Sequence, residues 1–274
     1  MQFACAFAMW ASMAENVPAT VYLVGAGPGD PELLTLRAAR LIGAARVIVH
    51  DGLVSREILA MAAPEAELIS VAKQRSRHSM PQQDINALLV RLAKAGQSVV
   101  RLKGGDPFIF GRGGEEVDAC REAGVPVEVV PGISAAIGSA AQAQLPLTHR
   151  AASSAVSFVA GQCKGLTDQD WSGLAGKGRT LVIYMGVATA ADIADKLMAD
   201  GVAPGIPVAV LENGTRPDMR TLRTLLADLG DMVKREQVKS PALIVVGEVA
   251  AHALARDVLA GWSAQAEMVS EMHK

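Results

Sequence analysis

Apolar and polar positions alternate in two rhythms along the first half of this chain. Short runs rich in Val, Ile and Leu, such as "TVYLVG" at 20–25 and "SVVRL" at 98–102, have the length and composition of buried strands. Between such runs, apolar residues recur three and four positions apart, which is typical of helices that bury one face. Strands separated by helices predict a mostly parallel sheet with helices on its faces. The helices are expected near 31–44, 55–63, 82–95 and 112–123.

The second half continues the alternation with different strand spacing, in the runs "AVSFVAG", "RTLVIYMG", "IPVAVLENG" and "PALIVVGEVA". Before them, "PGISAAIGSAAQAQLPLTHR" has a helix pattern of small residues and then a Pro-containing connection, so we expect the domains to join between 131 and 152. The sequence therefore predicts two α/β domains, with a ligand cleft between them. The expected divisions are an N-terminal tail, the two domains, and a C-terminal helix and tail: 1–19, 20–131, 132–250 and 251–274.

Composition and charge exclude several classes of protein. Half of the 274 residues are hydrophobic, which is enough for a sizeable core, and the formal net charge of −2 gives no global field that would attract nucleic acid. The three cysteines, Cys5, Cys120 and Cys163, are scattered without metal-ligand spacing. We therefore expect a reducing compartment, no disulfide framework and no metal site.

The first positions, "MQFACAFAMWASMA", are apolar but lack the basic flank of an export signal, and they are too short to span a bilayer. No later run of about twenty apolar residues is free of charges and glycines. We expect a cytoplasmic protein that interacts with no membrane and no nucleic acid. Its first residues are expected to form a loosely attached tail or an over-extended start, with a cryptic export signal as the alternative.

The stretch "VGAGPGDPELL" raises the question of a dinucleotide site. Such a site uses Gly-x-Gly-x-x-Gly, so that helix amides point at the pyrophosphate. Here the glycines alternate over 25–29, and Pro28 and Pro31 each remove a backbone donor. Asp30 is expected to cap the following helix and to repel an incoming anion. The pyrophosphate interpretation is therefore disfavoured, while a plain turn and a ligand-lining role both remain open.

Two further stretches follow strands and carry polar side chains. Asp51 stands at the carboxyl end of "RVIVH", where parallel sheets bind ligands, as a ribose acceptor or a general base. The stretch "RLKGGDPFIFGRGGEE" at 101–116 has glycines that let backbone approach a ligand, an acceptor at Asp106 and an apolar wall over 108–110. This combination favours a small, partly apolar and partly cationic ligand over a polyphosphate, with a plain glycine turn as the alternative.

Cationic side chains occur at two places near these stretches. Arg112 and Glu115 are three residues apart at the start of a helix pattern, so they lie on one face and either pair on the surface or meet a substrate together. The loop "KQRSRHSMP" is either a solvated face or a collector of carboxylate-rich substrate. Its basic residues are Lys73, Arg75, Arg77 and His78.

Taken in order, "VYLVGAGPGDPELLTLRA", "HDGLVS", "RHSMPQQDINALLV", "VVRLKGGDPFIFGRGGEE", "VVPGISAAIGSAA", "PLTHR", "YMG" and "PALIVVGEV" resemble the uroporphyrinogen-III C-methyltransferases of the tetrapyrrole methylase superfamily. The resemblance runs from about residue 20 to about residue 250. It implies two α/β domains of the class III methyltransferase type, S-adenosylmethionine bound between them and converted to S-adenosylhomocysteine, and a homodimer. It also implies methylation of uroporphyrinogen III at C2 and then C7, giving precorrin-2 through precorrin-1.

The resemblance also implies roles for individual residues. Asp51 corresponds to the family's proposed proton acceptor and Lys73 to its proposed proton donor. Around that lysine, the chain reads Ala72-Lys73-Gln74 where the family commonly has Gly-Lys-Arg, and it reads "LTHRAA" where the family usually has "LTHRD". The implied cofactor contacts are Pro28, Gly104, Gly105, Asp106, Ile109, Ser134, Ala135, Met185 and Gly214.

A substrate with eight carboxylates needs cations. Arg112 and Arg150 are the first choices, because a guanidinium grips a carboxylate with two hydrogen bonds. Glu115 is expected to orient Arg112 or to accept a pyrrole N–H. Further candidates for the substrate carboxylates are His149, Lys73, Arg75 and Arg77.

Other functions remain open from the residues. A nicotinamide-dependent oxidoreductase would also use glycines and an acidic residue at strand ends. A binding protein of this architecture would take the cofactor without methyl transfer, and other superfamily members methylate later corrinoid precursors, diphthamide or ribosomal RNA. The 274 residues contain no stretch that resembles a dehydrogenase–ferrochelatase domain, so we expect other proteins to carry out the later steps.

Overall fold

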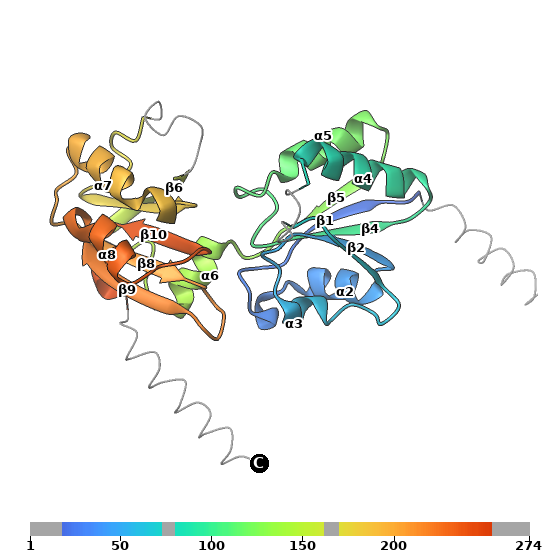
Figure 1. Cartoon of the computed structure of the whole chain (residues 1–274), viewed down its shortest axis with the longest axis horizontal. Helices are drawn as coiled ribbons and strands as arrows, with labels where there is room; N and C mark the ends of the chain where they lie inside the picture. Colours follow the sequence, from blue (N-terminus) through green and yellow to red (C-terminus); the bar gives the residue numbers. More distant parts are fainter. Residues whose placement is uncertain (1–17, 73–79, 162–169, 254–274) are drawn as a thin grey trace, which may run out of the picture. The chain divides into compact units, whose positions relative to one another are not determined.

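The computed structural model of this protein describes residues 18–72, 80–161 and 170–253 (Figure 1). These residues form two compact units. Unit 1 holds the described residues of Met1–Ala26 and Leu34–Gly132, and unit 2 holds those of Gly27–Leu33 and Ile133–Lys274. The prediction of two α/β parts is confirmed, and the short segment after the first strand groups with the second part.

Unit 1 is built on a five-stranded sheet in the order β3-β2-β4-β1-β5, in which every pair is parallel. The strands are β1 (Val21–Gly25), β2 (Val47–His50), β3 (Glu67–Ser70), β4 (Val99–Lys103) and β5 (Val127–Val130). All five residues of β4 are buried, because helices cover both faces of the sheet and leave the central strand no exposed side.

Side chains that alternate along these strands build two separate cores. Helices α4 (Gln82–Lys94) and α5 (Gly113–Glu122) pack on one face, against residues such as Leu23 and Val49. Helices α2 (Leu36–Ala44) and α3 (Arg56–Leu59) pack on the other, against Val24 and Ile48 (Figure 1). Successive strand residues point to opposite faces, which is why two sets of helices are needed.

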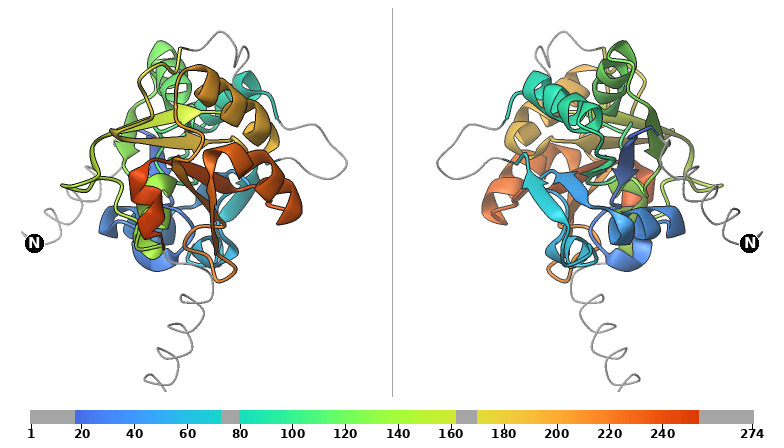
Figure 2. Two further views of the ribbon diagram at one scale, coloured as in Figure 1. Left: turned by 90° about the vertical axis from the view of Figure 1, so that its left-hand side faces the viewer. Right: turned by 90° about the vertical axis from the view of Figure 1, so that its right-hand side faces the viewer.

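Unit 2 has a mixed five-stranded sheet in the order β6-β7-β10-β8-β9, where β6 and β7 are parallel and the other pairs antiparallel. Helices α7 (Ala190–Ala199) and α8 (Leu229–Arg235) pack into the core on one face, and α6 (Ala135–Gln142) packs into the core on the other (Figure 2). The strands are β6 (Ser153–Ala160), β7 (Gly178–Tyr184), β8 (Pro207–Glu212), β9 (Arg220–Leu225) and β10 (Ala242–Val246). Short 3-10 helices are η1 (Pro31–Leu33), η3 (Val187–Thr189), η4 (Leu226–Asp228) and η5 (Glu248–His252).

The helix expected over 31–44 is two elements, and the carboxylate of Asp30 accepts an amide only in the first of them. Helix α2 is capped by Thr35, whose Oγ1 accepts the Ala38 N–H at 3.1 Å. Asp30 instead accepts the Glu32 N–H at 2.9 Å, in the 3-10 turn. A 3-10 turn followed by Thr35 in extended conformation breaks the helix, so the carboxylate of Asp30 is one turn too early to cap α2.

The helix expected near 55–63 is a single turn, α3. Cys120 is buried as a free thiol, while Cys5 and Cys163 lie outside the described residues. Within 18–72, 80–161 and 170–253, no helix has both the length and the apolar character needed to cross a membrane.

Candidate functional site

Asp51 and the glycine loop after β4 meet at the carboxyl edge of the unit 1 sheet. The Gly104 N–H donates to Oδ2 of Asp51 at 3.3 Å, and the Leu53 N–H donates to Oδ1 at 3.0 Å. These two hydrogen bonds fix the direction of the carboxylate, and each oxygen keeps a second lone pair for a further donor. The structure therefore brings together two of the stretches that the sequence singled out, at the edge where parallel sheets bind ligands.

Three glycines at neighbouring strand ends pack backbone against backbone. A Cβ on Gly132, after β5, would lie 2.3 Å from the carbonyl oxygen of Gly105, and a Cβ on Gly25, at the end of β1, would lie 2.5 Å from the Gly132 nitrogen. Both separations are far below any real Cβ contact. Glycine is thus required at positions 25 and 132 for contact within the fold.

Asp106 ties the glycine loop to the turn after β5. Its Oδ2 accepts the Gly132 N–H at 3.0 Å, and its Oδ1 accepts the Phe108 N–H at 2.9 Å. The wall of side chains that follows is exposed, with Ile109 at 37% and Phe110 at 42% of full exposure. The loop therefore presents an apolar surface beside a carboxylate whose orientation is fixed.

Arg112 and Glu115 form the pair that their spacing predicts. Arg112 Nε donates to Oε1 of Glu115 at 2.8 Å, and an Nη donates to Oε2 at 2.7 Å. This hydrogen bonding raises the pKa of Arg112 and lowers the pKa of Glu115. Both side chains are about half exposed, so water and a carboxylate substrate can reach the guanidinium.

A buried ion cluster that the sequence did not predict lies behind the glycine loop. Arg101 and Lys103 on β4 and Glu116 on α5 are each at most 3% exposed. Arg101 Nε donates to Glu116 Oε1 at 2.9 Å, and Lys103 Nζ donates to the same oxygen at 3.2 Å. Lys103 Nζ also lies 3.0 Å from Oε2, off the hydrogen-bonding direction of that oxygen. The signal that could have revealed the cluster is two cations at alternate positions of a central strand, which must find a buried anion.

Burial dominates the electrostatics of Lys103. Removal from water lowers the pKa of its ammonium, and the neighbouring charge of Arg101 lowers it further. Glu116 and Asp51 oppose this shift. The charge of Asp51 therefore also affects the pKa of this lysine, which directly precedes the glycine loop.

In unit 2, two of the implied cofactor positions, Pro28 and Gly214, pack against small residues of helix α6. A Cβ on Gly138 would lie 2.5 Å from Cγ of Pro28, so the proline ring rests on the helix backbone. A Cβ on Gly214 would lie 1.8 Å from Oγ of Ser139. Gly138 and Gly214 are therefore both required for packing within unit 2.

The start of α6 is joined to the end of β7. Ser134 is the N-cap residue and Ala135 the first residue of the helix. The Ala136 N–H donates to Oη of Tyr184 at 3.1 Å, and Oη lies 2.5 Å from Oγ of Ser134. Met185 follows Tyr184 directly, in left-handed conformation (φ 56°) and 46% exposed. Five implied cofactor positions, Pro28, Ser134, Ala135, Met185 and Gly214, thus lie on α6 or on segments that contact it.

The opening glycine turn also packs within unit 2. The Asp30 N–H donates to Oγ1 of Thr215 at 3.2 Å, and a Cβ on Gly29 would lie 2.9 Å from Cγ of Arg216. One amide of the turn is therefore already bonded, and two prolines contribute none. This geometry agrees with the argument against a pyrophosphate cradle.

The remaining candidates for binding the substrate carboxylates lie in the turn before β6 or outside the described residues. His149 and Arg150 are exposed in the turn before β6, where His149 Nδ1 accepts the Ala151 N–H at 3.2 Å and its ring stacks on His252 with centroids 5.1 Å apart. Lys73, Arg75, Arg77 and His78 lie outside the described residues.

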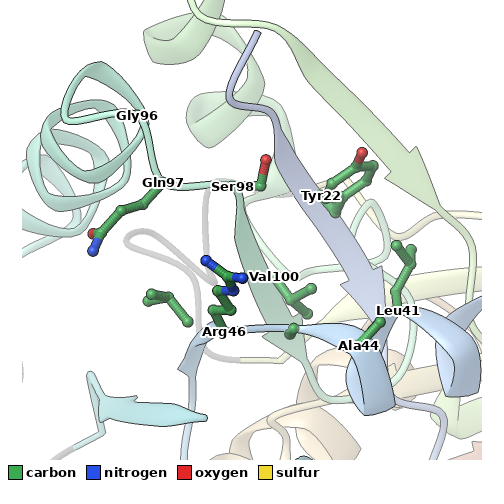
Figure 3. A pocket seen from close by; sticks show the side chains of 10 residues that line it. Tyr22, Leu41, Ala44, Arg46, Gly96, Gln97, Ser98 and Val100 are labelled. Atoms are coloured by element: carbon green, nitrogen blue, oxygen red, sulfur yellow. The ribbon is translucent and has the colours of Figure 1, made fainter. Parts of the chain in front are cut away.

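A pocket of about 510 Å³ lies at the opposite edge of the unit 1 sheet (Figure 3). It is lined by the starts of β1, β2 and β4 and by the end of α2, including Tyr22, Arg46 and Ser98. Parallel α/β sheets bind ligands at the carboxyl ends of their strands, so we do not place the site here. Among the described residues, no group of three or more His, Cys, Asp or Glu side chains is arranged to hold a metal ion.

The chain is similar to a family of known proteins over most of its length. Residues 20–230 match the family model described as Tetrapyrrole (Corrin/Porphyrin) Methylases. A siroheme synthase from Methylococcus capsulatus is 54% identical over 232 residues, which cover 84% of this chain and 49% of that protein. Another, from Gluconacetobacter diazotrophicus, is 51% identical and is covered to 50%. The chain spans about half the length of these relatives.

Solved structures show similarity over most of both chains. The uroporphyrin-III C-methyl transferase from Thermus thermophilus, complexed with S-adenyl homocysteine, has a TM-score of 0.73 at 42% identity, covering 84% of this chain and 93% of that one. A cobalt precorrin-4 methyltransferase has a TM-score of 0.75 at 26% identity, covering 84% and 95%.

Proposed function

This chain belongs to the tetrapyrrole (corrin/porphyrin) methylase family, and we propose on that premise that it transfers methyl groups from S-adenosylmethionine to uroporphyrinogen III. The methyl groups go to C2 and then to C7, giving precorrin-2 through precorrin-1. The observation that carries the proposal is the grouping of Pro28, Ser134 and Gly214 on and around α6, since these positions are far apart in sequence.

The residues present fit a sulfonium cofactor. Asp51 and Asp106 offer carboxylates with free lone pairs, and Ile109 and Met185 offer exposed apolar surface. A cation that carries a flat heterocycle needs both kinds of surface. A dinucleotide would instead need free amides in the opening turn, where Asp30 is already bonded to Thr215.

When bound, S-adenosylmethionine supplies an electrophilic methyl group on a positively charged sulfur. The contribution of this chain is then orientation, which can supply several kcal/mol when reacting atoms are held in line. In this proposal the residues that hold the cofactor are Gly104, Gly105 and Asp106, together with the positions around α6. Pro28 and Gly138 make that second surface rigid by direct contact.

Asp51 takes the proton that the ring carbon loses after methylation. Its carboxylate is held by the Leu53 and Gly104 amides, so the acceptor is oriented before substrate arrives. General bases of this kind contribute roughly 10²–10⁴-fold to rate. Lys73, which lies outside the described residues, corresponds to the family's proposed proton donor.

Arg112 binds a carboxylate of the substrate with its paired N–H groups, and Glu115 orients it or accepts a pyrrole N–H. Arg150, His149, Arg75 and Arg77 bind further carboxylates. The protein works as a homodimer, which size-exclusion chromatography with light scattering tests directly.

The function is tested with freshly reduced uroporphyrinogen III and methyl-labelled S-adenosylmethionine, with the product followed by mass and absorbance. We expect two labelled methyl groups per macrocycle. S-adenosylhomocysteine at one hundred times its Kd should stabilise the fold by about 2.7 kcal/mol, and NAD should leave the melting temperature unchanged. Stabilisation by NAD with no methyl transfer would replace the proposal with an oxidoreductase. Binding of S-adenosylhomocysteine without transfer to any tetrapyrrole would indicate a binding protein.

A further inference from the structure

Tyr184 connects two segments that the proposed function places at the cofactor. It is the last residue of β7, and its ring packs edge-on against Phe158 with centroids 5.9 Å apart. Its hydroxyl oxygen accepts the Ala136 N–H at 3.1 Å and lies 2.5 Å from Oγ of Ser134. The tyrosine itself has no role in the function derived above.

This arrangement differs from ordinary helix capping. The first amides of a helix lack partners within the helix, and a serine at the N-cap commonly accepts one of them with its own side chain. Ser134 makes no such capping hydrogen bond. The cap is supplied by Tyr184, 48 residues further along the chain, while the serine hydroxyl pairs with the same tyrosine oxygen. The start of α6 is thereby fixed to the end of β7 as well as being capped.

The residue after Tyr184 needs such support. Met185 has φ 56°, a left-handed conformation that costs a non-glycine residue of this kind free energy and persists only when its surroundings hold it. A β7 end that is bonded to α6 on one side and packed on Phe158 on the other is held in this way. The 46% exposed Met185 side chain is therefore presented from a fixed backbone.

We propose that the Tyr184 hydroxyl is a positioning group for the cofactor, holding Ser134–Ala135 and Met185 as one preformed surface. The inference rests on the proposed function, because that function makes these positions cofactor contacts. Tyr184 acts through its neighbours and needs no contact of its own with the cofactor. Preformed surfaces bind more tightly because less ordering is left to the binding step.

The test is Tyr184→Phe, which removes one oxygen and keeps the ring on Phe158. We expect the Kd for S-adenosylhomocysteine, measured by calorimetry, and the KM for S-adenosylmethionine to rise roughly tenfold, which corresponds to about 1.4 kcal/mol. The KM for uroporphyrinogen III should stay within twofold, because a purely structural defect would affect both substrates. The matched control is Tyr22→Phe, at the other tyrosine of the chain, which lines the pocket at the opposite edge of the unit 1 sheet; its Kd should equal that of the wild type.

A second variant, Ser134→Ala, keeps the bond between Tyr184 and Ala136 and should raise the Kd by a smaller factor. The double variant should bind no more weakly than Tyr184→Phe alone, since residues that act as one unit are not additive. An unchanged Kd in folded Tyr184→Phe would overturn the inference, and so would an unchanged Kd in Ser134→Ala if the tyrosine variant does not fold. Failure of the wild type to bind S-adenosylhomocysteine would instead overturn the proposed function.

Discussion

The carboxylate of Asp51 and the amide of Gly104 are hydrogen-bonded at 3.3 Å across the ends of β2 and β4. The proposed base and the proposed cofactor loop are therefore coupled, because a displacement of Asp51 or of Gly104 would change the position of the other residue. Lys103, directly before Gly104, adds an electrostatic link, because its pKa responds to Asp51 as well as to its own ion cluster.

Asp51→Asn separates the role of the base from the role of the loop anchor. The amide can still accept from one of the two backbone donors but carries no basic lone pair, so we expect kcat to fall roughly 10²–10⁴-fold. The loss of one amide bond should cost about 1 kcal/mol of stability. Single-turnover methyl transfer and S-adenosylhomocysteine titration measure both effects. Asp192→Asn, at an exposed position in the first turn of α7, is the control and should behave as the wild type.

Arg112→Gly tests substrate binding without backbone strain. Arg112 has φ 57°, which glycine adopts readily, so the variant loses the guanidinium but no favourable backbone geometry. The pair with Glu115 is half exposed, so its loss should change stability by less than about 1 kcal/mol. We expect kcat/KM for uroporphyrinogen III to fall at least a hundredfold (~2.7 kcal/mol) with cofactor affinity intact. Arg121→Ala, exposed in the last turn of the same helix, is the control; equal activity of the two variants would remove Arg112 from the site.

Gly132→Ala tests the packing of the three strand-end glycines. The added Cβ would lie 2.3 Å from the Gly105 oxygen, and because that neighbour is backbone, we expect a loss of at least about 1–3 kcal/mol in the free energy of unfolding. Gly114→Ala is the matched control: its Cβ meets nothing within 4 Å and it lies in α5, so it should stabilise by about 0.5–1 kcal/mol. Urea denaturation of both variants decides the matter, and equal stabilities would contradict the packing argument.

Lys103→Met tests the buried ammonium through the pH dependence of stability. The pKa of Lys103 in the fold is lowered from its ordinary value of 10.5. In the window between the lowered value and 10.5 the unfolded chain binds more protons than the folded chain, so stability rises with pH in that window. We therefore expect the wild type to gain stability relative to Lys103→Met as pH rises toward 10.5. Lys94→Met, at an exposed position of α4, controls for the loss of a lysine; a difference from wild type that is independent of pH would show that the ammonium carries no such shift.

Most of the fold and the family could be predicted from the sequence, because the Val- and Ile-rich runs of unit 1 become buried parallel strands and the ordered motifs are specific. The strand β9 was missed. Its sequence "RTLRTL" mixes arginines with apolar residues, since it is an edge strand with one covered face. The break between η1 and α2 was also missed, because a helical pattern does not distinguish a 3-10 turn from an α-helical one.

The meeting of Asp51 and Gly104 at one edge of the sheet was predictable, because each follows a parallel strand. The roles of other residues depend on contacts that no local pattern encodes. Glu116 looks like one of two surface glutamates in "GGEEV", yet it is fully buried between two cations. Gly105 looks like part of a ligand cradle, yet its carbonyl oxygen already packs against the backbone of Gly132, where an added Cβ would lie 2.3 Å away.

Residues 27–33 join β1 to α2, both in unit 1, and yet they belong to unit 2. The backbone therefore passes from one unit to the other three times, after Ala26, Leu33 and Gly132. A single proteolytic nick at the last of these points yields two incomplete fragments, because the C-terminal fragment lacks the proline that rests on Gly138. Fragment complementation, with the two pieces expressed together, is consequently a better route to the separate halves than expression of either one alone.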